Sequence, residues 1–246
     1  MDKLIYTAMT GANAAAQRQA VLSNNLANVS TNGFRAELAA YRAVPLRGDG
    51  ATTRVFALET TTGHLDTPGT AQLTGRDLDV MAQGNAWFAV QGLDGTEAYT
   101  RGGAFQLSAE GNLQTNSGLP VLSDGGAPIA IPPGATVSFG ADGTITAQVR
   151  GQQPAAVARL KMVTPNANEP IKRSADGLFR TATGDVLPNN AAARLMPGTL
   201  ESSNVNAIEN MVGMIQTARQ FEVQMRLLQT AESNDRSAGQ LLSLQG

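Results

Sequence analysis

The sequence predicts an α+β protein in which a mainly-β central domain is inserted between long N- and C-terminal α-helices that pair as a coiled coil. Near both ends of the 246-residue chain, apolar residues recur at alternating spacings of three and four, the heptad pattern of paired helices. Between the ends, closely spaced turn signals separate short runs of strand character, which is typical of a compact β domain. A helix with a single apolar face must bury that face. The terminal helices are therefore expected to pair with each other or with copies from other chains.

The first helix is predicted over residues 2–29. Its apolar positions are Ile5, Ala8, Ala12, Ala15, Gln19, Leu22, Leu26 and Val29. A Schellman ending is expected, with Gly33 just past the cap and Phe34 contacting Val29. Gly33 should therefore have a positive φ, in a turn that lies outside the β domain.

The second helix is predicted from Asn206 to about Arg236, a stretch that has no Pro and one Gly. Asn206 followed by Glu209 is typical of a capping box. Its predicted apolar seam is Ile208, Met211, Met214, Ala218, Phe221, Met225 and Leu228. Arg219 and Glu222 stand three residues apart and are expected to form at most a solvated surface pair.

The change of pattern along the chain predicts four segments. They are an N-terminal helix (1–35), an extended connector (36–75), the central β domain (76–198) and a C-terminal helix (199–246). The connector is rich in Thr and Ala and lacks clear periodicity. It is expected to pair with the returning chain around residues 186–200.

Composition excludes several classes of function. The net charge is −2 and the pI about 5.4, without the clustered Lys and Arg of a nucleic-acid-binding surface. The absence of cysteine removes disulfides, thiol catalysis and cysteine metal sites. No apolar stretch is long enough for a transmembrane helix. The N-terminus does not fit a cleaved signal peptide, because its first residues carry no net side-chain charge and polar residues interrupt its apolar run.

The sequence gives little sign of an enzyme. Its one histidine, His64, is expected to be a solvated loop residue, since no nucleophile elbow or zinc ligand set accompanies it. The sequence also lacks the glycine-rich phosphate-binding motifs. Asp77 and Asp79 are expected on an edge strand with their carboxylates facing water, where a raised catalytic pKa is not expected. No cofactor, metal, small-molecule substrate or nucleic acid is predicted.

Two other classes of function stay open from the residues alone. One is a cell-wall hydrolase that uses Asp77, Asp79 and Glu110. The other is a periplasmic glycan-binding module that uses Trp87 and Tyr99 as stacking platforms.

Three blocks of the chain, in order, resemble bacterial flagellar rod and hook proteins. Residues 23–35, which read SNNLANVSTNGFR, resemble the amino-terminal signature of that family. Residues 78–111 resemble the start of its β domain, with departures at Asn85-Ala86 and Gly102. Residues 200–222, which begin LESSNVN, resemble its carboxy-terminal signature.

This resemblance implies a structural subunit of the flagellar basal-body rod that assembles helically into the drive shaft that transmits torque. The opening and closing segments favour the proximal rod, and the distal rod protein is the alternative. The expected partners are copies of the same chain, neighbouring proximal and distal rod proteins, and the flagellar type III export apparatus. The rod lies in the periplasm, and export would occur without a cleaved signal peptide. The terminal helices would form an inner tube, with the β domain outside it.

The matched positions and the apolar seams together predict an assembly interface. Its residues are Ile5, Leu22, Asn24, Asn25, Leu26, Asn28, Val29, Gly33, Phe34, Asn204, Val205, Asn206, Met211, Ile215, Arg219, Phe221 and Glu222. The three asparagines of the first helix are expected to hydrogen-bond neighbouring chains and to fix register. Both termini are expected to be mobile in the isolated monomer and helical in the assembly.

Overall fold

The computed structural model describes residues 2–45, 55–166 and 169–243 and divides the chain into two compact units. The first unit consists of Met1–Asn28, Glu37–Gly63 and Val205–Gly246, and the second of Val29–Ala36 and His64–Asn204. The predicted four-segment division, with boundaries after residues 35, 75 and 198, stays a prediction.

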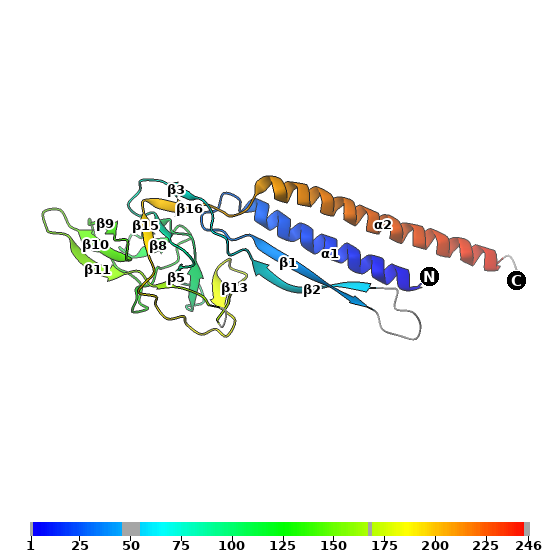
Figure 1. The fold of residues 1–246 in the computed structure, drawn as a ribbon, viewed down its shortest axis with the longest axis horizontal. Helices are drawn as coiled ribbons and strands as arrows, with labels where there is room; N and C mark the ends of the chain where they lie inside the picture. Colours follow the sequence, from blue (N-terminus) through cyan, green and yellow to red (C-terminus); the bar gives the residue numbers. More distant parts are fainter. Residues whose placement is uncertain (1, 46–54, 167–168, 244–246) are drawn as a thin grey trace. The chain divides into compact units, whose positions relative to one another are not determined.

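In the first unit, helix α1 (Asp2–Ala27) and helix α2 (Ala207–Ser243) lie side by side and run in opposite directions (Figure 1). Strand β1 (Glu37–Pro45) packs on α1 and pairs with β2 (Val55–His64). The predicted fold class is confirmed, because two long helices in contact flank a mainly-β region in the sequence. Among the described residues, neither helix contains a stretch apolar enough to cross a lipid bilayer.

Among the described side chains of α1, those that are buried within the chain are alanines, apart from Asn25 near the helix end. Ala8, Ala12 and Ala15 are buried, as the predicted seam requires, and their small side chains allow close approach of a neighbouring backbone. Side-chain atoms of Leu22 would lie only 3.3–3.4 Å from a Cβ at Gly213 of α2. The two helices therefore pack through small residues.

The buried face of α2 differs from its predicted seam. Thr217 and Ala231 are buried, whereas Ile208 and Met211 of the predicted seam are exposed. Asn206 caps the helix as predicted, since its Oδ1 accepts hydrogen bonds from the backbone N–H groups of Ile208 (3.1 Å) and Glu209 (3.3 Å). The apolar pattern of α2 thus marks a face that its own chain leaves exposed.

The end of α1 does not form the predicted Schellman motif. Gly33 has the expected positive φ, 71°, but α1 ends six residues earlier at Ala27. The Gly33 N–H donates to the carbonyl of Glu201 at 2.7 Å rather than to a helix carbonyl. Gly33 therefore belongs to the second unit, and the prediction that its turn lies outside the β domain was wrong.

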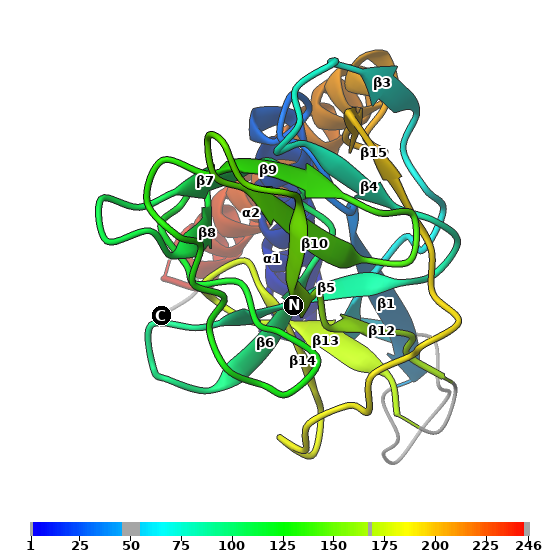
Figure 2. The same cartoon turned by 90° about the vertical axis from the view of Figure 1, so that its left-hand side faces the viewer.

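The second unit consists of short antiparallel strands (Figure 2). The strands are β3 (Ala71–Leu73), β4 (Val80–Ala82), β5 (Trp87–Gln91), β6 (Glu97–Thr100), β7 (Phe105–Leu107), β8 (Leu113–Thr115), β9 (Thr136–Phe139), β10 (Thr144–Gln148), β11 (Ala155–Arg159), β12 (Met162–Val163), β13 (Ile171–Arg173), β14 (Phe179–Thr181), β15 (Leu195–Pro197) and β16 (Thr199–Glu201). The largest sheet has the order β12-β5-β6-β14-β13, and a three-stranded sheet has the order β11-β10-β9. Three further pairs are β15-β4, β16-β3 and β7-β8. The connector therefore pairs with the returning chain through β3 and β16.

Alternation along β5 directs side chains into two apolar clusters. Phe88 and Val90 lie in the larger cluster, which also holds Phe105. Trp87 and Ala89 lie in the smaller one. Successive side chains of a strand point to opposite faces, so β5 is buried on both sides and the five-stranded sheet is covered on each face.

Gly33 lies against the backbone of Arg101 and Gly102. We predict that Gly33→Ala destabilises the second unit, whereas Gly102→Ala is tolerated. A Cβ at Gly33 would lie 2.3 Å from the carbonyl carbon of Arg101, at a positive φ, whereas the nearest atoms to a Cβ at Gly102 lie at 3.4 and 3.5 Å. The expected loss for Gly33→Ala is on the order of 3 kcal/mol, measured by urea unfolding of the second unit. Equal stability of the two variants would contradict this packing.

Candidate functional site

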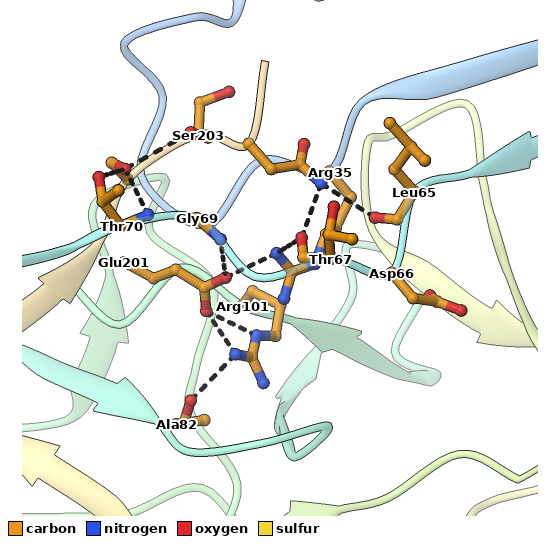
Figure 3. A network of polar contacts seen from close by, with 12 residues as sticks. Arg35, Leu65, Asp66, Thr67, Gly69, Thr70, Ala82, Arg101, Glu201 and Ser203 are labelled. Atoms are coloured by element: carbon orange, nitrogen blue, oxygen red, sulfur yellow. Dashed lines mark hydrogen bonds and ion pairs between the residues drawn. The ribbon is translucent and has the colours of Figure 1, made fainter. Parts of the chain in front are cut away.

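A buried ionic cluster centred on Glu201 joins distant parts of the second unit (Figure 3). Oε1 of Glu201 lies 2.6 Å from Nη1 of Arg35 and accepts the backbone N–H of Gly69 at 2.9 Å. Oε2 accepts hydrogen bonds from Nε and Nη2 of Arg101 at 2.8 and 2.5 Å. With the Gly33 N–H on its carbonyl, Glu201 binds three separate stretches of chain, which contain residues 33–35, Gly69 and Arg101.

The two arginines of this cluster are as buried as the carboxylate. Arg35 is 2% exposed and Arg101 is 1% exposed. Arg101 also donates to the carbonyls of Ala82 (3.0 Å), Gly84 (3.1 Å) and Ala86. Burial lowers the pKa of the Arg101 guanidinium, and the Glu201 carboxylate opposes that shift. Two buried cations thus share one buried anion, with backbone carbonyls satisfying further donors.

Sequence reasoning missed this cluster, although its three charged residues stand in the three blocks of family resemblance. Arg35 is the last residue of the first block, Arg101 lies in the second, and Glu201 is the second residue of the third. Only 15% of the residues in this chain are charged, yet each block contains one of these three. That pattern is the signal that could have suggested a shared ion-pair network.

We predict that Glu201→Gln lowers the free energy of unfolding of the second unit by roughly 3–5 kcal/mol, because it leaves two buried guanidinium groups without a counter-charge. The matched control is Glu232→Gln, which removes the exposed partner of Arg236 and should change stability little. Urea denaturation of both variants measures the difference. A similar small effect for both would show that the buried cluster contributes no more than a surface pair.

Asn204 forms a second polar centre in the same unit. Its Oδ1 accepts the backbone N–H of Ala36 at 2.7 Å. Its Nδ2 donates to the carbonyls of Leu65 (3.0 Å) and Thr67 (2.8 Å), and its N–H to the carbonyl of Phe34 (3.3 Å). The side chain therefore acts within the chain, joining residues 34–36 to residues 65–67.

His64 is not the solvated loop residue that was expected. It ends β2, its side chain is 13% exposed, and its Nε2 lies 2.9 Å from Oδ1 of Asp66. Its ring packs edge-on against Phe179 (4.8 Å) and Trp87 (6.0 Å). Desolvation lowers the pKa of the imidazole below its ordinary value of 6.5, Arg35 and Arg173 lower it further, and Asp66 opposes the shift.

We predict that acid weakens the second unit through His64, the one histidine of the chain. Because folding lowers its pKa, the folded chain binds this proton less readily than the unfolded chain. The stability that depends on neutral His64 is fully present above pH 6.5 and is lost as the pH falls through 6.5 toward the lower pKa of the folded state. Unfolding measured across this window should show a slope that His64→Phe removes. The same slope in wild type and variant would contradict the assignment.

Asp79, Trp87 and Tyr99, named for the two alternative functions, occupy structural positions, whereas Asp77 and Glu110 are exposed. Asp79 is buried, with its carboxylate bound by Arg76 and the hydroxyl of Thr74, so the expectation that it faces water was wrong. Trp87 and Tyr99 are 1% exposed and cannot stack on a glycan. Within the described ranges, no group of three or more His, Asp or Glu could hold a metal ion.

Asn24 and Asn25 of α1, and Asn28 just after the helix, bind within their own chain. Asn25, 4% exposed, accepts the backbone N–H of Glu37 (2.8 Å) and donates to the carbonyl of the same residue (3.0 Å). Asn24 donates to the Glu37 carboxylate at 2.9 Å, and Asn28 donates to the carbonyl and side chain of Asn24. These bonds fasten the start of β1 to the last turn of α1.

The other predicted interface residues are distributed over both units. Gly33 and Phe34 lie within the second unit, where the guanidinium of Arg173 lies over the Phe34 ring at 4.3 Å. Val205 is buried, and Leu22, Leu26 and Val29 are partly exposed. Arg219 and Glu222 are exposed, and no ion pair joins them in the part of the chain that the structure describes. The role of the predicted interface residues in contacts between chains stays a prediction.

The exposed residues of that predicted set include large apolar side chains of the two helices. On α2, Met211 and Ile215 lie beside Ile208 and Val212, and Phe221 is 39% exposed. On α1, Ile5 is exposed together with Tyr6 and Met9.

Three family models match the chain. "Flagella basal body rod protein" matches residues 5–35, "Flagellar hook protein FlgE/F/G D1 domain" residues 81–147, and "Flagellar basal body rod FlgEFG protein C-terminal" residues 196–241. The flagellar basal-body rod proteins FlgF of Salmonella typhimurium and Escherichia coli are each 45% identical over 253 residues, covering 99% of this chain and 100% of theirs. FlgG of Buchnera aphidicola subsp. Acyrthosiphon pisum is 33% identical over 96% of this chain and 98% of its own length.

Proposed function

We infer the role of this chain from one premise: it belongs to the FlgF family of flagellar basal-body rod proteins and is a structural subunit of the rod, not an enzyme. On this premise we propose that it assembles into the proximal rod through the outward faces of α1 and α2, as part of the drive shaft that transmits torque.

The observation that carries the proposal is an apolar surface on the first turns of α2, made of Ile208, Met211, Val212 and Ile215. These residues are 75%, 49%, 48% and 55% exposed. Their spacing of three, one and three residues places them on one side of the helix, away from the buried Thr217 and Ala231. Contiguous exposed apolar side chains of this size mark a protein interface, and a rod subunit is expected to bury them against other subunits.

The proposed partners are copies of this chain and the distal rod protein FlgG. The 33% identity to a FlgG relative over nearly the whole chain supports a shared mode of packing, in which similar helices lie side by side in one inner tube. We further propose that the chain reaches the periplasm through the flagellar type III export apparatus without a cleaved signal peptide. The expected mobility of both termini in the monomer belongs to the same proposal, since assembly would then cover the exposed faces.

The proposed contact residues of the helices are six exposed members of the predicted interface. They are Ile5, Met211, Ile215, Arg219, Phe221 and Glu222. The exposed Ile208 and Val212 join them.

We predict that Ile215→Asp prevents rod assembly and leaves the fold of the monomer intact. Ile215 is already exposed, so a charge costs the monomer little, whereas an unpaired charge buried between subunits costs several kcal/mol. Motility and recovery of rods from cells carrying the variant measure assembly, and thermal melting of the purified chain measures the fold.

The matched control is Ser233→Asp, on the same exposed face of α2 five helical turns further on but outside the apolar surface. It should assemble nearly as well as wild type. Normal motility of Ile215→Asp would contradict the proposed interface, and so would a loss of motility that melting traces to misfolding.

A further inference from the structure

Asn32 and Gly33 form the one Asn-Gly pair of the sequence. An asparagine followed by glycine is especially prone to deamidation, because glycine has no side chain to hinder the attack of its backbone nitrogen on the carboxamide. For that attack the nitrogen must give up its proton and move toward Cγ of the asparagine. Whether the pair reacts therefore depends on how the fold holds the glycine nitrogen.

The nitrogen of Gly33 is held firmly in the folded second unit. Its N–H donates to the carbonyl of Glu201 at 2.7 Å, and Gly33 is buried. A Cβ at Gly33 would lie 2.3 Å from the carbonyl carbon of Arg101 and 2.5 Å from the nitrogen of Gly102, so the backbone has no space to shift in that direction. Bringing the nitrogen to the Asn32 carboxamide would break the hydrogen bond and displace this packed backbone.

The carboxamide of Asn32 is less enclosed than the nitrogen that would attack it. Asn32 is partly exposed. It lines a hollow of the second unit together with the hydroxyl-bearing residues Thr31, Thr100 and Thr115, and water reaches it there. The fold therefore blocks the reaction at its nucleophile, the Gly33 nitrogen, and not at the carboxamide.

We propose that Asn32 is a deamidation site that the folded second unit keeps closed and that unfolding opens. In the reaction the Gly33 nitrogen bonds to Cγ of Asn32 and the bond from Cγ to the side-chain nitrogen breaks. That side-chain nitrogen leaves as ammonia and takes the proton of the Gly33 N–H. Water then opens the cyclic imide at either carbonyl, which leaves aspartate or isoaspartate at position 32.

The isoaspartate product would disturb the cluster around Glu201. Its main chain runs through the former side chain, which adds one carbon before the Gly33 nitrogen. The Gly33 N–H and the Arg35 guanidinium, which now bind the Glu201 carbonyl and carboxylate at 2.7 and 2.6 Å, would lose their common register. A chain modified while it is unfolded would thus carry a permanent obstacle to refolding. This inference goes beyond the proposed rod function and does not rest on it.

Peptide mass spectrometry of the full-length chain, incubated in mildly alkaline buffer with and without urea, tests the site. Trypsin should release residues 19–35, and fragmentation distinguishes Asn32 from Asn24, Asn25 and Asn28 of the same peptide. Deamidation of Asn32 should be roughly a hundredfold or more slower without urea, because the reaction must wait for the unit to open. In urea, Asn32 should react before the other three. Equal rates at Asn32 in the two buffers, or no preference for Asn32 in urea, overturns the proposal.

A destabilised variant shows whether the folded unit supplies the protection. Glu201→Gln should speed deamidation of Asn32 without urea by roughly a hundredfold, since the unit would open more often, and a variant that fails to fold should react at the full unfolded rate. Glu232→Gln, the exposed control, should leave the rate unchanged. An unchanged rate in a Glu201→Gln chain whose free energy of unfolding has fallen overturns the shielding.

Refolding tests the consequence of the modification. Chains aged in urea and then diluted should recover the fluorescence of buried Trp87, the one tryptophan, only in proportion to the fraction that lacks isoaspartate at residue 32. Asn32→Asp carries the other product on an unaltered main chain and should refold. Aged Asn32→Gln should also refold, because a glutamine must form a larger ring to react. Full recovery by chains that carry isoaspartate, or failure of either control, overturns this consequence.

Discussion

The carboxylate of Glu201, held between the guanidinium groups of Arg35 and Arg101, is the interaction on which the second unit most depends. All three side chains are withdrawn from water, where an unpaired charge costs several kcal/mol. The arrangement is stable only when all three side chains are present, because the negative charge of Glu201 compensates the positive charges of the two arginines. Its members come from the segment after α1, the end of β6 and the end of β16. Folding of this unit must therefore bring both ends of its sequence together around one carboxylate.

Because of this cluster, the backbone at two glycines lies close to other parts of the chain. Gly33 and Gly69 both donate their N–H groups to Glu201, one to its carbonyl and one to its carboxylate. A Cβ at Gly69 would lie 1.9 Å from the carbonyl oxygen of Ser202, so only glycine fits there.

The elements that local pattern determines were predictable from the sequence. Heptad spacing gave α1 to within two residues of its end, and Asn206 identified the start of α2. The buried face of α2 was not predictable, because Ile208 and Met211 follow the same heptad rule whether they face α1 or another chain. The proposed rod assembly supplies the reason, since its subunits would cover a face that the single chain leaves exposed.

Buried polar residues were the main failure of sequence reasoning. Asp79 and His64 were expected to face water, because charged and titratable side chains are seldom buried unless they are paired. The ion-pair partner of Asp79 is Arg76, only three residues away in the sequence. The rings that cover His64, Trp87 and Phe179, come from distant parts of the sequence. Nothing in the sequence around His64 reveals that its side chain is buried. Glu201 and its two arginines show the same limit, and only their places in the three resembling blocks could have suggested a common role.

Native-state hydrogen exchange at the Gly33 and Gly69 amides, followed at increasing denaturant concentration, tests the central role of Glu201 most directly. If the unit is organised around this carboxylate, both amides should open only with the whole second unit, at the same free energy as the amides of β5 and β6. Exchange of either amide through a local opening, at a free energy well below that of the core strands, would contradict the account.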